Sequence, residues 1–272
     1  CNGAEETYCI ECMMHDRKAL QAGTSHYFGD GFARAFEITF TGADNQLHFP
    51  HQTSWGVSTR LIGGIIMTHG DDNGLVLPPR IAPVQAVVIP IAQHKPGVLD
   101  AAGKLLERLQ QAGVRSRMDD SDKAPGWKFA EYEMRGVPLR VEIGPKDMEK
   151  DQCCIARRDT GEKTFVPLAE LESTVAKLLD DIHNNMFAMA KKNLEDNSCT
   201  AETLEQVKEI TGRLGGGFVH TKWCGELACE LAMKEQAGVT SRCMPLAQSG
   251  TTGKCPVCGK ECTTDIIWGV AY

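Results

Sequence analysis

The sequence predicts a multi-domain protein that combines α/β and α+β units. Its 272 residues are enough for two or three compact units. Hydrophobic residues make up 42% of the chain, so these units can bury cores. Strand and helix patterns alternate along the middle of the chain, which is typical of an α/β layer. We expect domains at residues 1–82, 83–190 and 191–272.

Charge and hydropathy exclude several classes of protein. The formal net charge of −7 argues against a protein that coats nucleic acid without specificity, although a local basic surface can still bind RNA. No segment approaches ~18 consecutive apolar residues, so we expect no membrane-spanning helix. The chain begins with Cys1-Asn2-Gly3-Ala4, without Met and without a signal peptide. We therefore expect a fragment or a processed chain.

The twelve cysteines do not have the placement of a secreted disulfide scaffold. Cys9, Cys12, Cys153 and Cys154 lie in apolar or strand-like runs, and four others near the C-terminus have the spacing of metal ligands. We expect reduced thiols and a cytoplasmic setting.

Residues 1–82 contain short β-like runs separated by turns. Segment 35–40 (Ala-Phe-Glu-Ile-Thr-Phe) alternates as a half-buried strand would. Segment 71–74 (Asp-Asp-Asn-Gly) predicts a turn. Segment 75–77 (Leu-Val-Leu) predicts a short strand, which Pro78 and Pro79 end.

Residues 83–190 predict an α/β layer with a mostly parallel or mixed sheet. The apolar run 85–91 is typical of a buried strand, and further strands are predicted at 114–118, 137–143, 152–157 and 163–166. Helical spacing predicts a helix over 98–109, with Gly113 as a stop after it. A long helix is predicted over 168–195, with an apolar face formed by Leu171, Val175, Leu178, Ile182, Met186 and Met189.

The last segment predicts a smaller α/β unit. A helix near 201–210 leads to a loop of three glycines at 215–217. A strand over 218–223, a helix over 224–237 and a strand over 239–243 follow. The apolar end, 266–272, is expected to dock against another part of the chain.

Two cysteine pairs predict a metal centre. Cys224 and Cys229 form one pair, and Cys255 and Cys258 form the other within Cys-Pro-Val-Cys-Gly. Four thiolates around one point suit tetrahedral Zn²⁺ and leave no open coordination position, so the metal would be structural. Two alternatives remain, namely four buried free thiols or two disulfides. Cys262 is close enough in sequence to compete as a ligand.

A run of small residues at 53–64 contains one tryptophan and one arginine. Glycine and hydroxyl residues let a ligand approach the backbone closely. Arg60 precedes an apolar helix-like stretch and could hold a phosphate with its planar guanidinium. A tight strand–helix junction that binds nothing would use the same glycines.

A second polar run lies at 21–26, where Gln-Ala-Gly-Thr-Ser-His offers an amide, two hydroxyls and an imidazole. In an extended segment, Thr24 and His26 lie on the same face, because side chains two residues apart share a face. The alternative is a turn with a hydrogen-bonded histidine.

These motifs together resemble the prolyl-tRNA synthetase family. The runs at 19–26, 54–64 and 69–83 are similar to its catalytic segments, and 136–147 is similar to its anticodon-binding domain. The four cysteines and the ending Ala271-Tyr272 are similar to the archaeal and eukaryote-like subtype. The resemblance covers essentially the whole chain.

The resemblance implies a class II aminoacyl-tRNA synthetase. Its catalytic domain is an antiparallel sheet flanked by helices, here present in part, followed by an α/β anticodon-binding domain and a small zinc-type α/β domain. The implied reaction uses ATP with Mg²⁺ to activate L-proline as prolyl-adenylate, and then transfers the prolyl group to tRNA(Pro). The intact proteins of the family are homodimers.

The resemblance also assigns site residues. Arg60, the arginine of motif 3, is the implied catalytic residue. The implied ATP-binding residues are Gln21, Thr24, Ser58 and Arg60, and the implied proline-binding residues are His26, Trp55 and Gly56. Candidate tRNA contacts are Trp127, Lys128, Phe129 and Arg140, because aromatic rings stack on unpaired bases and cations meet phosphate. Trp127 and Phe129 could instead belong to the core.

The chain contains no counterpart of motifs 1 and 2 of the family, which carry the dimer interface, another ATP arginine and acidic ligands of the proline amine. We therefore expect no aminoacylation by these 272 residues alone. The alternative to an enzyme fragment is a non-catalytic tRNA-binding or interaction module derived from a synthetase. A third possibility, another class II synthetase with the same anticodon domain, fits the 24–26 and 54–56 runs less well.

Overall fold

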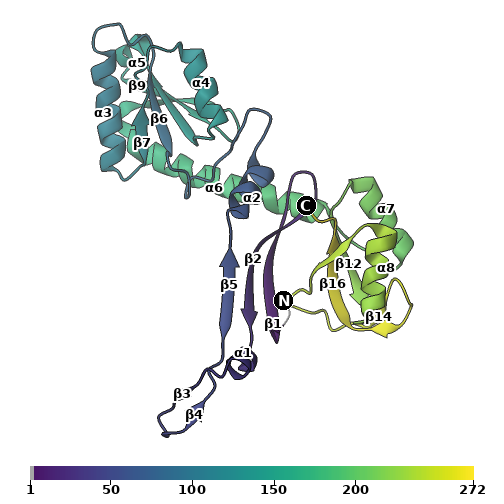
Figure 1. The fold of residues 1–272 in the computed structure, drawn as a ribbon. Coiled ribbons are helices and arrows are strands. Elements are labelled where there is room, and N and C mark those ends of the chain that lie inside the picture. Colours follow the sequence, from purple (N-terminus) through teal and green to yellow (C-terminus); the bar gives the residue numbers. More distant parts are fainter. Residues whose placement is uncertain (1–2) are drawn as a thin grey trace. The chain divides into compact units, whose positions relative to one another are not determined.

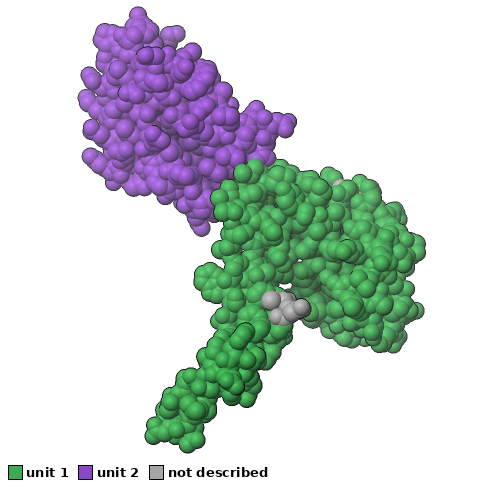
Figure 2. Space-filling model, viewed as in Figure 1, with its two compact units in different colours: residues 1–68, 193–272 green, residues 69–192 purple. Residues whose placement is uncertain are grey.

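The computed structural model describes residues 3–272 of the chain (Figure 1). It divides into two compact units, shown in different colours in Figure 2. Unit 1 combines Cys1–Thr68 with Asn193–Tyr272, and unit 2 is His69–Lys192. Within the described residues, no helix is both long and apolar enough to cross a membrane.

Unit 1 begins with a three-stranded antiparallel sheet in the order β1-β2-β5. The strands are β1 (Glu6–Met13), β2 (Ala19–Tyr27) and β5 (Thr53–Val57), and helix α2 (Arg60–His69) follows β5 after two residues. The predicted helix-like stretch after Arg60 is therefore confirmed. Gly23 lets β2 and β5 approach, because a Cβ there would lie 3.1 Å from Val57 Cγ1.

A short helix and a small hairpin connect β2 to β5. They are α1 (Gly31–Ala35), β3 (Phe40–Thr41) and β4 (Leu47–His48). The predicted strand at 35–40 is wrong, because Ala35 ends α1 and Glu37 has a positive φ of 55°. The alternation there has no physical basis in burial, since Phe36 and Ile38 are 71% and 45% exposed.

The C-terminal part of unit 1 is a four-stranded mixed sheet in the order β11-β12-β16-β13. Its strands are β11 (Ser198–Thr200), β12 (Phe218–Trp223), β13 (Thr240–Cys243) and β16 (Thr264–Gly269). Helices α7 (Leu204–Leu214) and α8 (Leu227–Ala237) pack on it, and the hairpin β14 (Gly253–Lys254) and β15 (Glu261–Cys262) lies beside it. The core includes Val207, Met233 and Trp268, so both helices cover one buried layer.

The chain's last residues dock on β2, as predicted. Ala19 N–H donates to the carbonyl of Val270 at 2.8 Å, and Tyr272 N–H donates to the carbonyl of Ala19 at 3.0 Å. The glycine loop contributes a second contact, because a Cβ at Gly216 would lie only 2.7 Å from the carbonyl oxygen of Arg17. The C-terminal sheet is thereby joined to the N-terminal one within unit 1.

Unit 2 contains a five-stranded mixed sheet in the order β10-β9-β8-β6-β7. Its strands are β6 (Ala86–Pro90), β7 (Ser116–Met118), β8 (Leu139–Ile143), β9 (Gln152–Arg157) and β10 (Lys163–Pro167). Its helices are α3 (Val98–Gln111), α4 (Pro125–Met134), α5 (Pro145–Glu149) and the start of α6 (Leu171–Asp196), which follows a 3₁₀ turn η1 (Leu168–Glu170). The predicted mixed α/β sheet is confirmed.

Two details of unit 2 differ from the predictions. No strand forms at 75–77, although backbone N–H groups there donate to the end of α4 and the residues after it: Leu75 to the carbonyl of Met134 at 2.9 Å, and Leu77 to that of Gly136 at 3.2 Å. On α6, Leu179 lies in the core with Ile182 and Met186, whereas Met189 is 59% exposed. Helix α6 continues for ten residues after Met186, its last buried residue. The apolar spacing that predicted Met189 on the buried face therefore extends beyond the core.

Candidate functional site

The β1–β2–β5 sheet brings several of the predicted site residues to one face. Directly opposed residues of antiparallel strands share a face. Thr24 lies opposite Cys9 and Gly56, and His26 lies opposite Thr7 and Ser54. His26 Nδ1 is 3.1 Å from the hydroxyl of Thr7. This face therefore carries hydroxyls, an imidazole and a glycine.

Trp55 does not join this group. It lies opposite Ser25, on the other face of the sheet from His26, and it is 75% exposed. Ser54 takes the position beside His26 that sequence reasoning gave to the tryptophan. The strand alternation within the 53–57 run could have indicated this, once the register against β2 was known.

Arg60 begins α2 at the end of the same sheet. The backbone N–H of Arg60 donates to the hydroxyl of Ser58 at 3.2 Å, so Ser58 helps to define the start of the helix. Its guanidinium Nη1 donates to the backbone carbonyl of Gln21 at 3.4 Å. None of the carboxylates in the described residues forms an ion pair with Arg60, so its charge is available to an anion.

A cavity of about 450 Å³ adjoins this arginine. Ser58 and Arg60 line it together with Leu20 and with Tyr272 of the docked C-terminus. Gln21 lines a different cavity of about 880 Å³, between β1 and the C-terminal sheet. Three of the predicted ATP-binding residues thus line two separate cavities, and Thr24 lines neither of them.

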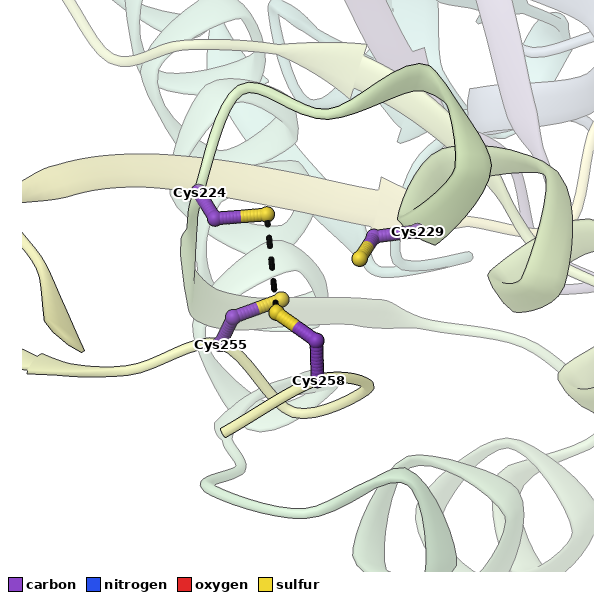
Figure 3. A group of neighbouring side chains, drawn as sticks. All are labelled: Cys224, Cys229, Cys255 and Cys258. Atoms are coloured by element: carbon purple, nitrogen blue, oxygen red, sulfur yellow. Dashed lines mark hydrogen bonds between the residues drawn. The ribbon is translucent and has the colours of Figure 1, made fainter. Parts of the chain in front are cut away.

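The four predicted metal ligands converge on one point (Figure 3). All four Sγ atoms lie within 4.8 Å of one another, and Cys258 Sγ is 3.8 Å from Cys224 Sγ. A tetrahedral Zn²⁺ with Zn–S bonds of ~2.3 Å separates its sulfur ligands by about 3.8 Å, so this donor set fits a metal of that kind. The cluster is able to hold a metal ion.

The four thiols come from the end of a strand, a helix and a turn. Cys224 follows β12, Cys229 lies in α8, and Cys255 and Cys258 lie in the turn after β14. That turn is closed by Gly259, whose φ is 73° and whose N–H donates to the carbonyl of Cys255 at 2.9 Å.

The thiols of the cluster differ in acidity. Burial raises the pKa of Cys255, but hydrogen bonds from the backbone N–H groups of Cys258 and Val257 outweigh it, and the pKa falls to about 7. Burial raises the pKa of Cys229, whose thiol interacts with the other three. One ligand is thus ready to ionise near neutral pH, which favours metal binding.

The described cysteines all carry free thiols, and none of them is joined in a disulfide. Cys1 lies outside the described residues. Cys262 is not part of the metal-ligand group. Cys243 lies on β13 and is half-buried at the edge of the 880 Å³ cavity.

The candidate tRNA contacts of unit 2 fall into two groups. Trp127 is 49% exposed, and Lys123 Nζ lies 5.4 Å from its ring centroid. Lys128 is buried, at 2% exposure, and donates to the carbonyl of Asp119 at 2.8 Å. Trp127 therefore lies at the surface, while the ammonium of Lys128 is used inside the unit.

Phe129 is the centre of a cationic cluster. Arg140 Cζ lies 4.0 Å and Lys163 Nζ 5.3 Å from its ring centroid. Arg140 is largely buried and also pairs with Glu133 at 3.0 Å and Glu142 at 2.8 Å. Sequence reasoning missed Lys163, because only the pairing of β9 with β10 brings it to the ring.

Comparisons with known proteins agree with this architecture. A family model described as an anticodon binding domain matches residues 85–178. A second, described as prolyl-tRNA synthetase, C-terminal, matches residues 204–272. The first covers the five-stranded sheet of unit 2, and the second covers α7, α8, the last strands and the cysteine cluster.

Curated relatives match along the chain. The proline–tRNA ligase of Clostridium novyi (strain NT) is 56% identical over 270 residues, which are 99% of this chain and 56% of the relative. The proline–tRNA ligases of Ruminiclostridium cellulolyticum and Clostridium botulinum (strain 657) are 55% and 54% identical over the same shares. The chain is similar to prolyl-tRNA synthetases along its whole length. It spans about half the length of the curated relatives that it matches.

These relatives confirm the resemblance to prolyl-tRNA synthetases seen in the sequence motifs. The runs at 19–26 and 54–64 form neighbouring strands and the start of α2, so the most distinctive motifs are also neighbours in space. The anticodon-binding and C-terminal segments each form the compact α/β fold expected of them.

Proposed function

We propose that this chain is part of a proline–tRNA ligase. The observation that carries the proposal is identity of 53–56% to curated proline–tRNA ligases along 270 residues. The sheet face with Thr24, His26 and Ser54, next to an unpaired Arg60, supports it with chemistry suited to a small polar substrate and a phosphate.

The proposed reaction has two steps. A carboxylate oxygen of L-proline attacks the α-phosphorus of ATP, the bond to the β-phosphate breaks, and pyrophosphate leaves. A ribose hydroxyl at the 3′ end of tRNA(Pro) then attacks the prolyl carbonyl, and AMP leaves. Both steps depend mainly on positioning and on compensating phosphate charge.

In this proposal each site residue has one role. Arg60 is the catalytic residue that holds the phosphate chain with Mg²⁺, because its guanidinium has no carboxylate partner. Gln21, Thr24 and Ser58 contact ATP. His26 binds proline together with Gly56, and the strand register favours Ser54 over Trp55 as their neighbour.

We also propose the following division of labour. Residues 1–82 are the C-terminal part of a class II catalytic domain, 83–190 bind the anticodon, and 191–272 form a zinc-binding domain of the archaeal and eukaryote-like subtype. The intact protein would be a cytoplasmic homodimer. The cysteine cluster would hold Zn²⁺ in a structural role, because four thiolates leave no position for substrate.

For tRNA recognition, exposure separates direct contacts from supporting ones. Trp127 and Lys163 are accessible, at 49% for the tryptophan and 49% for the lysine side chain. We propose that these two and the edge of Phe129 meet the anticodon, while Lys128 and Arg140 hold them in place. Aromatic stacking on unpaired bases contributes about 1–3 kcal/mol per base.

A chimera tests the proposed activity. These 272 residues replace the matching segment of the Clostridium novyi enzyme, which supplies the remaining part of a full-length protein. We expect proline-dependent exchange of pyrophosphate into ATP and aminoacylation of tRNA(Pro), and neither activity from the 272 residues by themselves. A folded chimera that binds tRNA(Pro) but does not exchange pyrophosphate would favour the non-catalytic module instead.

A further inference from the structure

A buried carboxylate lies beside the proposed ATP site, and none of the roles above uses it. Glu11 lies on β1 opposite a β-bulge of β2, where the register shifts between Ile10 and Glu11 and leaves Ala22 without a partner on β1. The bulge places Glu11 opposite Gln21. Only 4% of the Glu11 side chain is exposed. Burying an ionised carboxylate is costly unless it is paired.

The partner comes from a distant part of the sequence. Arg242, on β13 of the C-terminal sheet, lies with its Nε 3.2 Å from Glu11 Oε2, and its Nη2 donates to Oε1 at 3.4 Å. The Nε and Oε2 atoms are both buried and lack a well-directed hydrogen bond, so the shorter contact is an ion pair only. Both residues belong to unit 1.

The other titratable groups around Glu11 are neutral thiols. They are Cys9 and Cys12 on β1 and Cys243 on β13, and burial raises the pKa of each. Burial also raises the pKa of Glu11, and the charge of Arg242 opposes that rise. Arg242 is therefore the only cation among the described residues that compensates this carboxylate.

Glu11 is in turn connected to Gln21. The two residues are directly opposed in the β1–β2 register, so their side chains are neighbours on one face of the sheet. The backbone carbonyl of Gln21 accepts from Arg60 at 3.4 Å. Gln21 thus lies between two arginines: Arg60 contacts its backbone carbonyl, and Arg242 pairs with the carboxylate opposite it. Gln21, Cys9 and Arg242 also line the same 880 Å³ cavity.

We propose that Arg242 is a positioning residue for ATP: it neutralises Glu11 and thereby fixes the Gln21 amide in the orientation that contacts the nucleotide. The proposal rests on the proposed function, which makes Gln21 an ATP contact. Without Arg242, Glu11 is an unpaired buried carboxylate beside a polyanionic substrate. It repels the triphosphate when ionised and no longer holds the amide in one orientation.

The test uses the chimera and the variant Arg242→Met, which keeps an unbranched apolar stem and removes the guanidinium charge. We expect KM for ATP in pyrophosphate exchange to increase about tenfold, which corresponds to ~1.4 kcal/mol. KM for proline should stay within about twofold, a change of less than ~0.5 kcal/mol. Arg135→Met is the matched control, because that arginine directly follows α4, is 59% exposed and, among the described residues, forms its ion pair with Glu131.

A second variant separates positioning from general destabilisation. Glu11→Gln combined with Arg242→Met removes both charges and leaves an amide that can still bond to Gln21. We expect the double variant to recover most of the lost ATP affinity. A purely structural role for Arg242 would predict no such recovery and an equal effect on both substrates.

The pH profile gives a further readout. In Arg242→Met the pKa of Glu11 rises further, because the opposing positive charge is gone. As pH increases through that pKa, Glu11 ionises, and KM for ATP should rise with it. The double variant has no carboxylate there and should lack this dependence.

The outcomes distinguish the two proposals. A folded chimera without exchange activity contradicts the proposed function, and the role of Arg242 falls with it. Two results in an active chimera contradict only the role of Arg242. One is an unchanged KM for ATP in Arg242→Met. The other is a KM for ATP that is as high in the double variant as in the single one.

Discussion

At the scale of single residues, neighbours in the fold decide whether a cation can act on a ligand. The guanidinium of Arg60 donates to a backbone carbonyl and pairs with no carboxylate of the described residues, so its charge can act on a ligand. Arg140 pairs with two carboxylates and stacks on Phe129, and Lys128 is buried against Asp119. The sequence marks all three as candidate cations, but only one of them is positioned to meet a phosphate directly.

Arg60 provides a prediction at this scale. Arg60→Ala in the chimera should reduce kcat/KM for ATP by about 10²–10³-fold, which is typical of removing one preorganised donor from a developing charge. Steady-state pyrophosphate exchange measures the change. Arg34→Ala is the control, because that guanidinium is 61% exposed and paired with Asp30. Equal activity of the Arg60→Ala and unmodified chimeras would rule out a catalytic role.

At the scale of elements, periodicity predicted secondary structure well wherever a core covers it. The strands at 86–90 and 152–157 and the helix at 98–111 agree with the sequence patterns, because their apolar residues face a continuous buried cluster. The segment 35–40 failed for the opposite reason. Its alternating residues are exposed, so local hydrogen bonds of α1 decide its conformation.

Helix α6 provides a prediction at this scale, because two methionines of one face differ in burial. Met186 is 3% exposed in the core of unit 2, and Met189 is 59% exposed. Met186→Ala should lower the free energy of unfolding by about 2–5 kcal/mol. Met189→Ala should change it by less than ~0.5 kcal/mol. Urea unfolding followed by circular dichroism compares the two, and similar losses would contradict the assigned face.

At the scale of the whole molecule, contacts between distant segments build the site. The cysteine cluster joins the β12–α8 loop to a turn about thirty residues later. The Glu11–Arg242 pair joins β1 to β13, across 231 residues. The C-terminus lies along β2, beside Arg60. Each contact makes the N-terminal sheet depend on the C-terminal one within unit 1.

Metal removal provides a prediction at this scale. The purified chain should bind one Zn²⁺ per molecule, measured by elemental analysis, and Cys255→Ser with Cys258→Ser should abolish binding. Cys262→Ser is the control, because Cys262 lies outside the cluster, and it should retain the metal. Chelation should also lower the melting temperature, since binding energy at a structural site contributes to folding. Stoichiometric zinc in the Cys255→Ser, Cys258→Ser variant would contradict the ligand assignment.

The sequence by itself determined the family resemblance, the mixed α/β class and the four cysteines that cluster, because these depend on motifs, periodicity and spacing that are local in the chain. Only the tertiary structure decided which side chains share a face and which cations are already neutralised. Trp55 and Ser54 are adjacent in sequence, yet strand register puts them on opposite faces. No local pattern could pair Glu11 with Arg242, because the contact exists only once two separate sheets pack together.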